Sequence, residues 1–160
     1  MSRTLSFFGL LIIVIGVAKP AAADLTAFVG STQSLSNRNA TGVAVGLSLA
    51  IIGFEFEYSN SSIDNLQDKT ELKSSMLNVL LQSPFPISRL QFYGTIGVGL
   101  YRERLGRSRY TGLGNNMGAG VKVSLMEPFR LRFDYRSLRL GKSSKRRAIQ
   151  RFYAGLTLDF

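Results

Sequence analysis

Apolar and polar positions alternate in eight stretches of the chain after residue 23. Successive side chains of a β-strand point to opposite faces, so each stretch predicts a strand with one apolar face and one polar or small face. Polar or turn-forming segments separate the stretches. The predicted strands span residues 25–31, 41–49, 54–58, 71–82, 89–101, 110–125, 129–136 and 149–160. The pattern therefore predicts an all-β protein.

The regularity of the alternation differs among these strands. It is clearest in the seventh, where Phe129, Leu131, Phe133 and Tyr135 oppose Arg130, Arg132, Asp134 and Arg136. It is weakest in the fourth, because residues 76–81 are almost continuously apolar. A short apolar run is also compatible with a buried helix, which remains the alternative there.

The connections between the strands are predicted to alternate in length. Those after the first, third, fifth and seventh strands are polar and cover residues 34–40, 59–70, 102–109 and 140–148, roughly eight to twelve residues each. Those after the second, fourth and sixth strands are predicted to be short. Transmembrane β-barrels have short periplasmic turns and longer extracellular loops, so this asymmetry is typical of that class.

Residues 1–23 are predicted to be a cleaved export signal rather than part of the fold. Arg3 provides a positive start, residues 7–17 are apolar, and three alanines at 21–23 offer a cleavage site. A membrane anchor is the alternative, but a spanning helix needs about 20 apolar residues. The domain is therefore expected to cover residues 24–160.

The amino-acid composition limits the catalytic and metal-binding chemistry that the protein can carry out. The 160 residues contain no Cys and no His, which removes disulfides, thiolate metal sites, the commonest general base and the commonest transition-metal ligand. No cofactor, metal site or enzymatic activity is predicted. The formal net charge of +10 predicts attraction to polyanions.

The last strand carries a family resemblance. It ends the chain on an aromatic residue, and apolar residues occupy alternate positions, among them Phe152, Leu156, Leu158 and Phe160. This ending resembles the closing strand of bacterial outer-membrane barrels, which the barrel-assembly machinery recognises. With eight strands and alternating connections, the chain resembles the OmpA/OmpX-like family. The resemblance implies an eight-stranded antiparallel up-and-down β-barrel in the outer membrane, a monomer whose biogenesis partner is that machinery.

In such a barrel the apolar faces are expected to contact lipid and the polar faces to line the lumen. The inward charges form the predicted lumen network: Glu55, Glu57, Arg130, Arg132, Asp134 and Arg136. Eight strands leave an interior just wide enough for side chains, so a plugged lumen is expected. Small inward residues such as Gly118 and Gly120 would leave room for the arginines. A soluble lipocalin-type barrel, with apolar residues inside, is the alternative.

Two basic clusters are predicted in the last long connections. Their members are Arg102, Arg104, Arg107 and Arg109 in one, and Arg139, Lys142, Lys145, Arg146 and Arg147 in the other. At the outer surface they would face lipopolysaccharide phosphates, and we expect them to bind anionic lipid headgroups. A merely solvated rim is the alternative. Nucleic acid is not expected as a partner of an exported barrel.

These observations predict an outer-membrane protein with a structural or surface-interaction role, in envelope integrity, lipopolysaccharide contact or adhesion. The resemblance also covers a lipid A palmitoyltransferase and a lipid A deacylase, but both use an essential His with a Ser, and this chain has no His. A small channel and a soluble periplasmic barrel that binds a hydrophobic ligand remain the alternatives.

Overall fold

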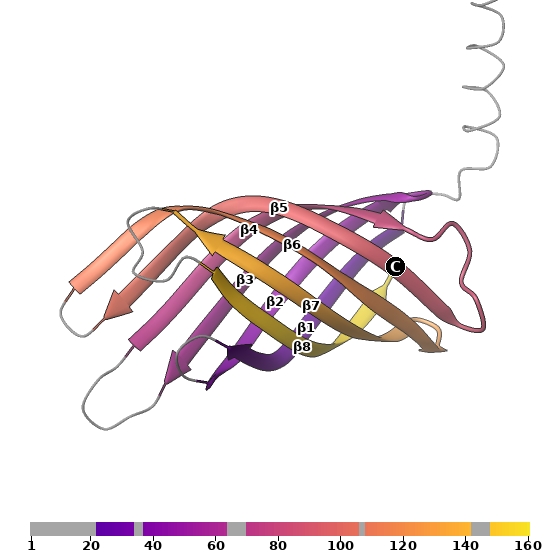
Figure 1. The fold of residues 1–160 in the computed structure, drawn as a ribbon. Coiled ribbons are helices and arrows are strands. Elements are labelled where there is room, and N and C mark those ends of the chain that lie inside the picture. The colour runs from indigo at the N-terminus through magenta and orange to yellow at the C-terminus, as the bar shows by residue number, and fades with distance from the viewer. Residues whose placement is uncertain (1–21, 34–36, 64–69, 106–107, 142–147) are drawn as a thin grey trace, which may run out of the picture.

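The computed structural model describes residues 22–33, 37–63, 70–105, 108–141 and 148–160, and these residues form a closed β-barrel (Figure 1). Each strand pairs antiparallel with the next, and the last pairs with the first. The strands are β1 (Ala22–Gln33), β2 (Asn37–Leu49), β3 (Ile52–Ile63), β4 (Thr70–Gln82), β5 (Leu90–Leu105), β6 (Ser108–Met126), β7 (Phe129–Leu140) and β8 (Ala148–Asp159). The predicted all-β, eight-stranded antiparallel barrel is confirmed.

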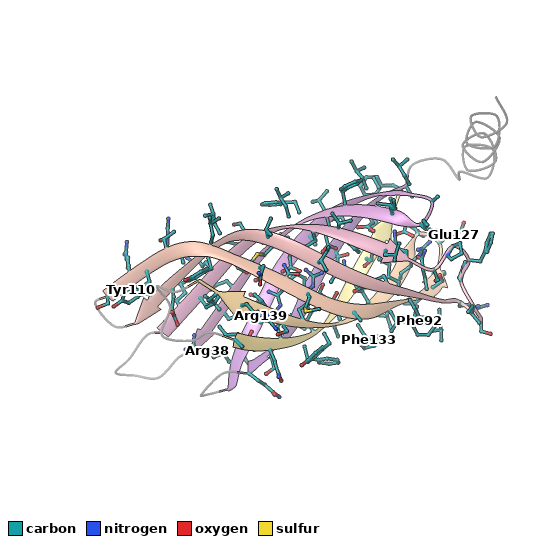
Figure 2. All side chains as sticks on the ribbon, turned by 45° about the horizontal axis from the view of Figure 1, so that its top comes forward. Arg38, Phe92, Tyr110, Glu127, Phe133 and Arg139 are labelled. Atoms are coloured by element: carbon teal, nitrogen blue, oxygen red, sulfur yellow. The ribbon has the colours of Figure 1, made fainter. Side chains whose placement is uncertain are left out.

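The two ends of the barrel differ. We call one of them the terminal end, because it holds the start of β1 and the end of β8. It also holds the connections β2–β3, β4–β5 and β6–β7. The opposite end, here the loop end, holds the four remaining connections. In Figure 2, Tyr110 and Arg38 lie toward the loop end and Glu127 lies at the terminal end. At the terminal end, reciprocal backbone hydrogen bonds of 2.9 Å between Ala23 and Phe160 complete the ring.

Apolar side chains cover the outside of the barrel and charged side chains fill the inside. Leu77, Ile96 and Val98 are each more than 60 % exposed, whereas Glu57, Arg132 and Arg136 have no exposed surface. Figure 2 shows Phe92 and Phe133 projecting from the outer wall. The soluble-barrel alternative requires the reverse arrangement and is wrong.

The irregular fourth stretch forms strand β4, not a helix. Leu77, Val79 and Leu81 point outward, while Met76 and Leu80 are buried inside. The inner face of this strand carries apolar as well as polar residues, because Met76 and Leu80 pack against other side chains in the lumen. That packing explains why the sequence lacks alternation there.

The strands continue further toward the loop end than the sequence predicts, so the predicted loop lengths are wrong. At least half of each of three predicted loops lies within strands, since β2 starts at Asn37, β3 ends at Ile63 and β5 ends at Leu105. The connection at residues 83–89, predicted to be short, is longer than that at residues 106–107. In these extensions the outer face carries polar residues beyond the apolar belt and the inner face carries buried polar residues such as Arg38 and Glu103. Polar residues therefore follow one another while the backbone ladder continues.

The two ends of the barrel do differ in connection length when each connection is counted from the last outward apolar residue of the strands it joins. At the loop end, the outward apolar residues Leu100 and Leu113 flank a long polar hairpin of β5 and β6. At the terminal end, Met126 and Phe129 flank a two-residue turn. Because extracellular excursions are the longer ones in transmembrane barrels, we orient the loop end toward the cell exterior.

Residues 1–21 lie outside the described residues, so the export signal and the boundary after residue 23 stay predictions. Among the residues that are described, no helix has the length and hydrophobicity to cross a membrane.

Candidate functional site: the charged lumen and the outer basic band

The lumen is crossed by ion pairs between β3 and β7, which lie on opposite walls. Arg132 of β7 pairs with Glu55 of β3, and its Nε donates a hydrogen bond of 2.7 Å to the hydroxyl of Tyr93 on β5. The same guanidinium lies 3.2 Å from a carboxylate oxygen of Asp134. Arg132 therefore joins two carboxylates and a phenol from three strands.

Arg136 is the centre of the network. Its nitrogens lie 2.8 Å from carboxylate oxygens of Glu55, Glu57 and Asp134. Arg151 of β8 pairs with the same Glu57 and donates a hydrogen bond of 2.6 Å to the hydroxyl of Ser59. The planar guanidinium has five donors in a fixed fork, which suits it to bridging several carboxylates.

Three carboxylates and three guanidinium groups thus form one cluster, so its formal charge is zero. Neutral polar groups extend it: Asn78 donates to Glu55 at 3.0 Å, and Arg136 donates to the Tyr153 hydroxyl at 3.2 Å. Buried charges are tolerated when they are paired, and each of these six groups has at least one partner of opposite charge.

Glycines on β6 provide the space for this cluster. A Cβ at Gly118 would lie 2.9 Å from Cγ of Arg136 and 2.2 Å from the carbonyl oxygen of Tyr135. A Cβ at Gly120 would lie 2.3 Å from the hydroxyl oxygen of Tyr93. A larger residue at either position would displace a member of the network.

Other layers fill the lumen on both sides of the network. Toward the loop end lies an apolar layer formed by Leu72, Met76, Tyr101, Leu138, Leu140 and Ile149. Toward the terminal end, Lys122 pairs with Asp24 at 2.6 Å, and the hydroxyls of Thr26 and Thr157 lie 2.8 Å apart. The described part of the lumen is therefore filled through its height by side chains.

One residue of the predicted lumen network is placed differently by the structure. Arg130 lies at the rim of the terminal end, where its side chain is 33 % exposed and pairs with Asp159 at 2.6 Å. It has the same parity as Arg132 but is only one residue from the start of β7, so it reaches the mouth of the barrel instead of the interior.

Sequence reasoning also missed members of the lumen. Arg151 points inward, and the sequence held a signal for this: it lies two residues from Tyr153 and so shares its face of the last strand. Arg38 and Glu103 are buried inside as well, near the loop end. They lie in segments predicted to be loops, so no strand parity was available for them.

The predicted basic residues that the structure describes form an outward band at the loop end. Arg102 and Arg104 on β5, Arg109 on β6 and Arg139 on β7 are exposed, and Arg104 pairs in register with Arg109. They lie on strands rather than in loops. Lys73 on β4 is the register partner of Arg102 and extends the band. We call these five residues the basic band; Arg107, Lys142, Lys145, Arg146 and Arg147 lie outside the described residues.

The predicted assembly signal lies on the outside of β8. Phe152, Leu156 and Phe160 are exposed, and Leu158 is half-buried on the same face. Within the described part of the chain, no group of three or more carboxylates is arranged to hold a metal ion.

Comparisons with known proteins agree with this geometry. Residues 21–160 match the family model described as the outer membrane protein beta-barrel domain. The chain belongs to this outer-membrane β-barrel family. Its members are the OmpA/OmpX-like small barrels that the sequence resembles, and the protein is an outer-membrane protein.

Solved structures show the same fold at low sequence identity. Surface protein A of Neisseria is 18 % identical, with a TM-score of 0.73 over 89 % of this chain and 99 % of that one. The N-terminal barrel of Pseudomonas aeruginosa OprF is 17 % identical, with a TM-score of 0.60 over 87 % and 97 %. Ail of Yersinia pestis, solved with the heparin analogue sucrose octasulfate, is 11 % identical, with a TM-score of 0.62 over 89 % and 100 %. No curated protein matches the sequence.

Proposed function

We propose that the protein is a non-enzymatic structural barrel that binds the phosphates of outer-leaflet lipopolysaccharide through its basic band. The observation that carries this proposal is the position of the band. Arg102 and Arg104 follow Leu100 on the outer face of β5, so the cations begin where the apolar belt ends. Lipid phosphates lie at that level of a membrane, and Arg binds them with paired hydrogen bonds.

The charge distribution supports the same role. The lumen cluster is neutral, whereas the chain carries a net charge of +10, so the excess of basic groups lies outside the cluster. A filled lumen supports a structural role over a channel. The absence of His from the sequence supports a role other than His-dependent lipid A chemistry.

The test is binding of purified lipid A to the refolded barrel, measured by native mass spectrometry. Arg102→Gln is expected to weaken binding about fivefold, since one basic residue near an anionic surface contributes about 1 kcal/mol. A variant with Arg102, Arg104, Arg109 and Arg139 all changed to Gln is expected to weaken it at least tenfold.

Arg89→Gln is the matched control, because Arg89 is exposed at the opposite, terminal end of the barrel. It should bind like the wild type. Equal binding of lipid A and of lipid A stripped of its phosphates would contradict the proposal.

A sulfated polysaccharide is a second candidate ligand for the same band, and it would give the barrel a role in adhesion. Support comes from the exposure of the arginines and from the sulfated ligand of Ail, a barrel of the same fold. Heparin chromatography tests it: the fourfold Gln variant should elute at lower salt than Arg89→Gln. Elution of the two variants at the same salt concentration would rule this candidate out.

A further inference from the structure

A groove crosses the lipid-facing wall of the barrel over β8, β1, β2 and β3. Its volume is about 710 Å³, within the range of roughly 300–1,000 Å³ that is usual for ligand sites. Its lining combines small side chains, among them Ala27 and Ala154, with larger ones such as Tyr58 and Leu156. The groove is open toward the membrane.

Strand register explains the shape of the groove. One outward row runs across the sheet through Asn60, Thr41, Val29 and Ala154, which are partners in successive strand pairs. The neighbouring outward row runs through Tyr58, Val43, Ala27 and Leu156. Between the two rows the side chains point inward, so backbone of Phe28, Gly42 and Gly155 forms the floor.

The groove slopes from the loop end of the barrel toward the terminal end. Lys73 closes one end, three residues from the loop end of β4, and Leu131 closes the other, two residues from the terminal end of β7. The four strands of the floor span three interstrand spacings, about 14 Å. With strands tilted by about 45°, this corresponds to a drop of about 10 Å, within the ~15 Å depth of one leaflet.

The upper end of the groove is polar and basic. Lys73 lies there beside Asn60, its register partner, whose side-chain oxygen has no hydrogen-bond partner among the described residues. Lys73 pairs with Glu71 at 2.9 Å, and across the strand pair Arg102 lies opposite Lys73 and Arg104 opposite Glu71. Lys73 thus lies at the head of the groove, with Glu71 paired to it and with Arg102 and Arg104 on the adjacent strand β5.

We propose that this groove binds one acyl chain of a phosphorylated glycolipid of the outer leaflet, with a phosphate of the same molecule at Lys73 and Arg102. The combination of a cationic head and an apolar channel of one-leaflet depth matches the chemistry of such a lipid. The inference rests on the proposed function, because it gives the lipid that contacts the basic band a defined acyl site.

The experiment is native mass spectrometry of the refolded barrel in nanodiscs that contain phosphatidylcholine and a small fraction of lipid A. The wild type is expected to retain one lipid A molecule. Ala27→Phe fills the groove and is expected to reduce retention about tenfold, and Lys73→Gln about fivefold. Ala119→Phe is the matched control, because Ala119 is an exposed outward alanine on β6, outside the groove, and should retain lipid as the wild type does.

Equal retention of lipid A by Ala27→Phe and the wild type would overturn the proposal that the groove binds lipid. Equal losses of lipid A in Ala27→Phe and Ala119→Phe would overturn it too. A dimer mass that disappears only in Ala27→Phe would identify a second copy of the chain as the occupant and also overturn it. If only the fourfold Gln variant loses lipid, the result contradicts the acyl site in the groove and supports phosphate binding by the basic band. If only Ala27→Phe loses lipid, the result supports the acyl site and contradicts the proposed role of the basic band.

Discussion

At the scale of the residue, the lumen network is a set of mutually dependent charges. Each of Glu55, Glu57 and Asp134 contacts at least two basic or polar groups, and each of the three arginines contacts at least one carboxylate. Removing charges from water costs several kcal/mol per ion, which their mutual attraction offsets only if all partners are present. The network is therefore more sensitive to the loss of one member than its net contribution to stability suggests.

Glu55→Gln tests that dependence. The substitution preserves shape but leaves Arg132 without its β3 carboxylate, and we expect the free energy of unfolding to fall by about 3–5 kcal/mol. Urea unfolding of the barrel in lipid vesicles measures this change. Glu71→Gln, which breaks the half-exposed pair with Lys73, is the control and should cost about 1 kcal/mol or less. Equal losses in the two variants would contradict the account of the network.

At the scale of the element, strand parity predicted most of the barrel from the sequence. Parity predicts Phe133 on the outer face and Arg132 on the inner face, and the structure shows both there. Parity does not give the height of a residue along the barrel axis, so the sequence predicts the same lumen position for Arg130 as for Arg132. Parity also disappears where both faces of a strand are polar, so the sequence predicts Arg38 and Glu103 to lie in loops. The parity of Arg151 matches that of Tyr153, and both are buried in the lumen.

The closing strand carries a prediction that concerns biogenesis. If Phe160 is part of the assembly signal, Phe160→Ser should lower the amount of barrel in the outer membrane of expressing cells by several-fold. Purified and refolded, the variant should lose no more stability to urea than Phe92→Ser, because both substitutions remove one outward-facing Phe, 71 % and 51 % exposed in the barrel.

Phe92→Ser is the control for that prediction, since Phe92 is also exposed and faces lipid, but on β5. A similar drop in outer-membrane level for both variants would show that lost lipid contact, not recognition of the last strand, causes the effect.

At the scale of the whole molecule, the lumen is layered and the charge is segregated. Polar pairs, the charged network and the apolar layer succeed one another from the terminal end to the loop end. Among the described residues of the apolar layer, the Tyr101 hydroxyl is the one polar side-chain group, and it alone could not replace the hydration shell of an ion. Transport through the barrel would require several layers to rearrange together.

We therefore expect the refolded barrel to show no stepwise conductance in a planar bilayer. Gel mobility before and after boiling in detergent confirms that the tested sample is folded, since a closed barrel should run faster when unboiled. Resolved single-channel steps from such a sample would contradict the sealed lumen.

The division of the network between β3 and β7 has a consequence for the order of assembly. The two glutamates belong to an early strand, whereas the arginines that neutralise them belong to the last two strands. A sheet that stops short of β7 presents uncompensated carboxylates on its concave side, and completing the ring removes that penalty in one step. Partly built forms are thereby disfavoured, and insertion becomes a cooperative, all-or-none event.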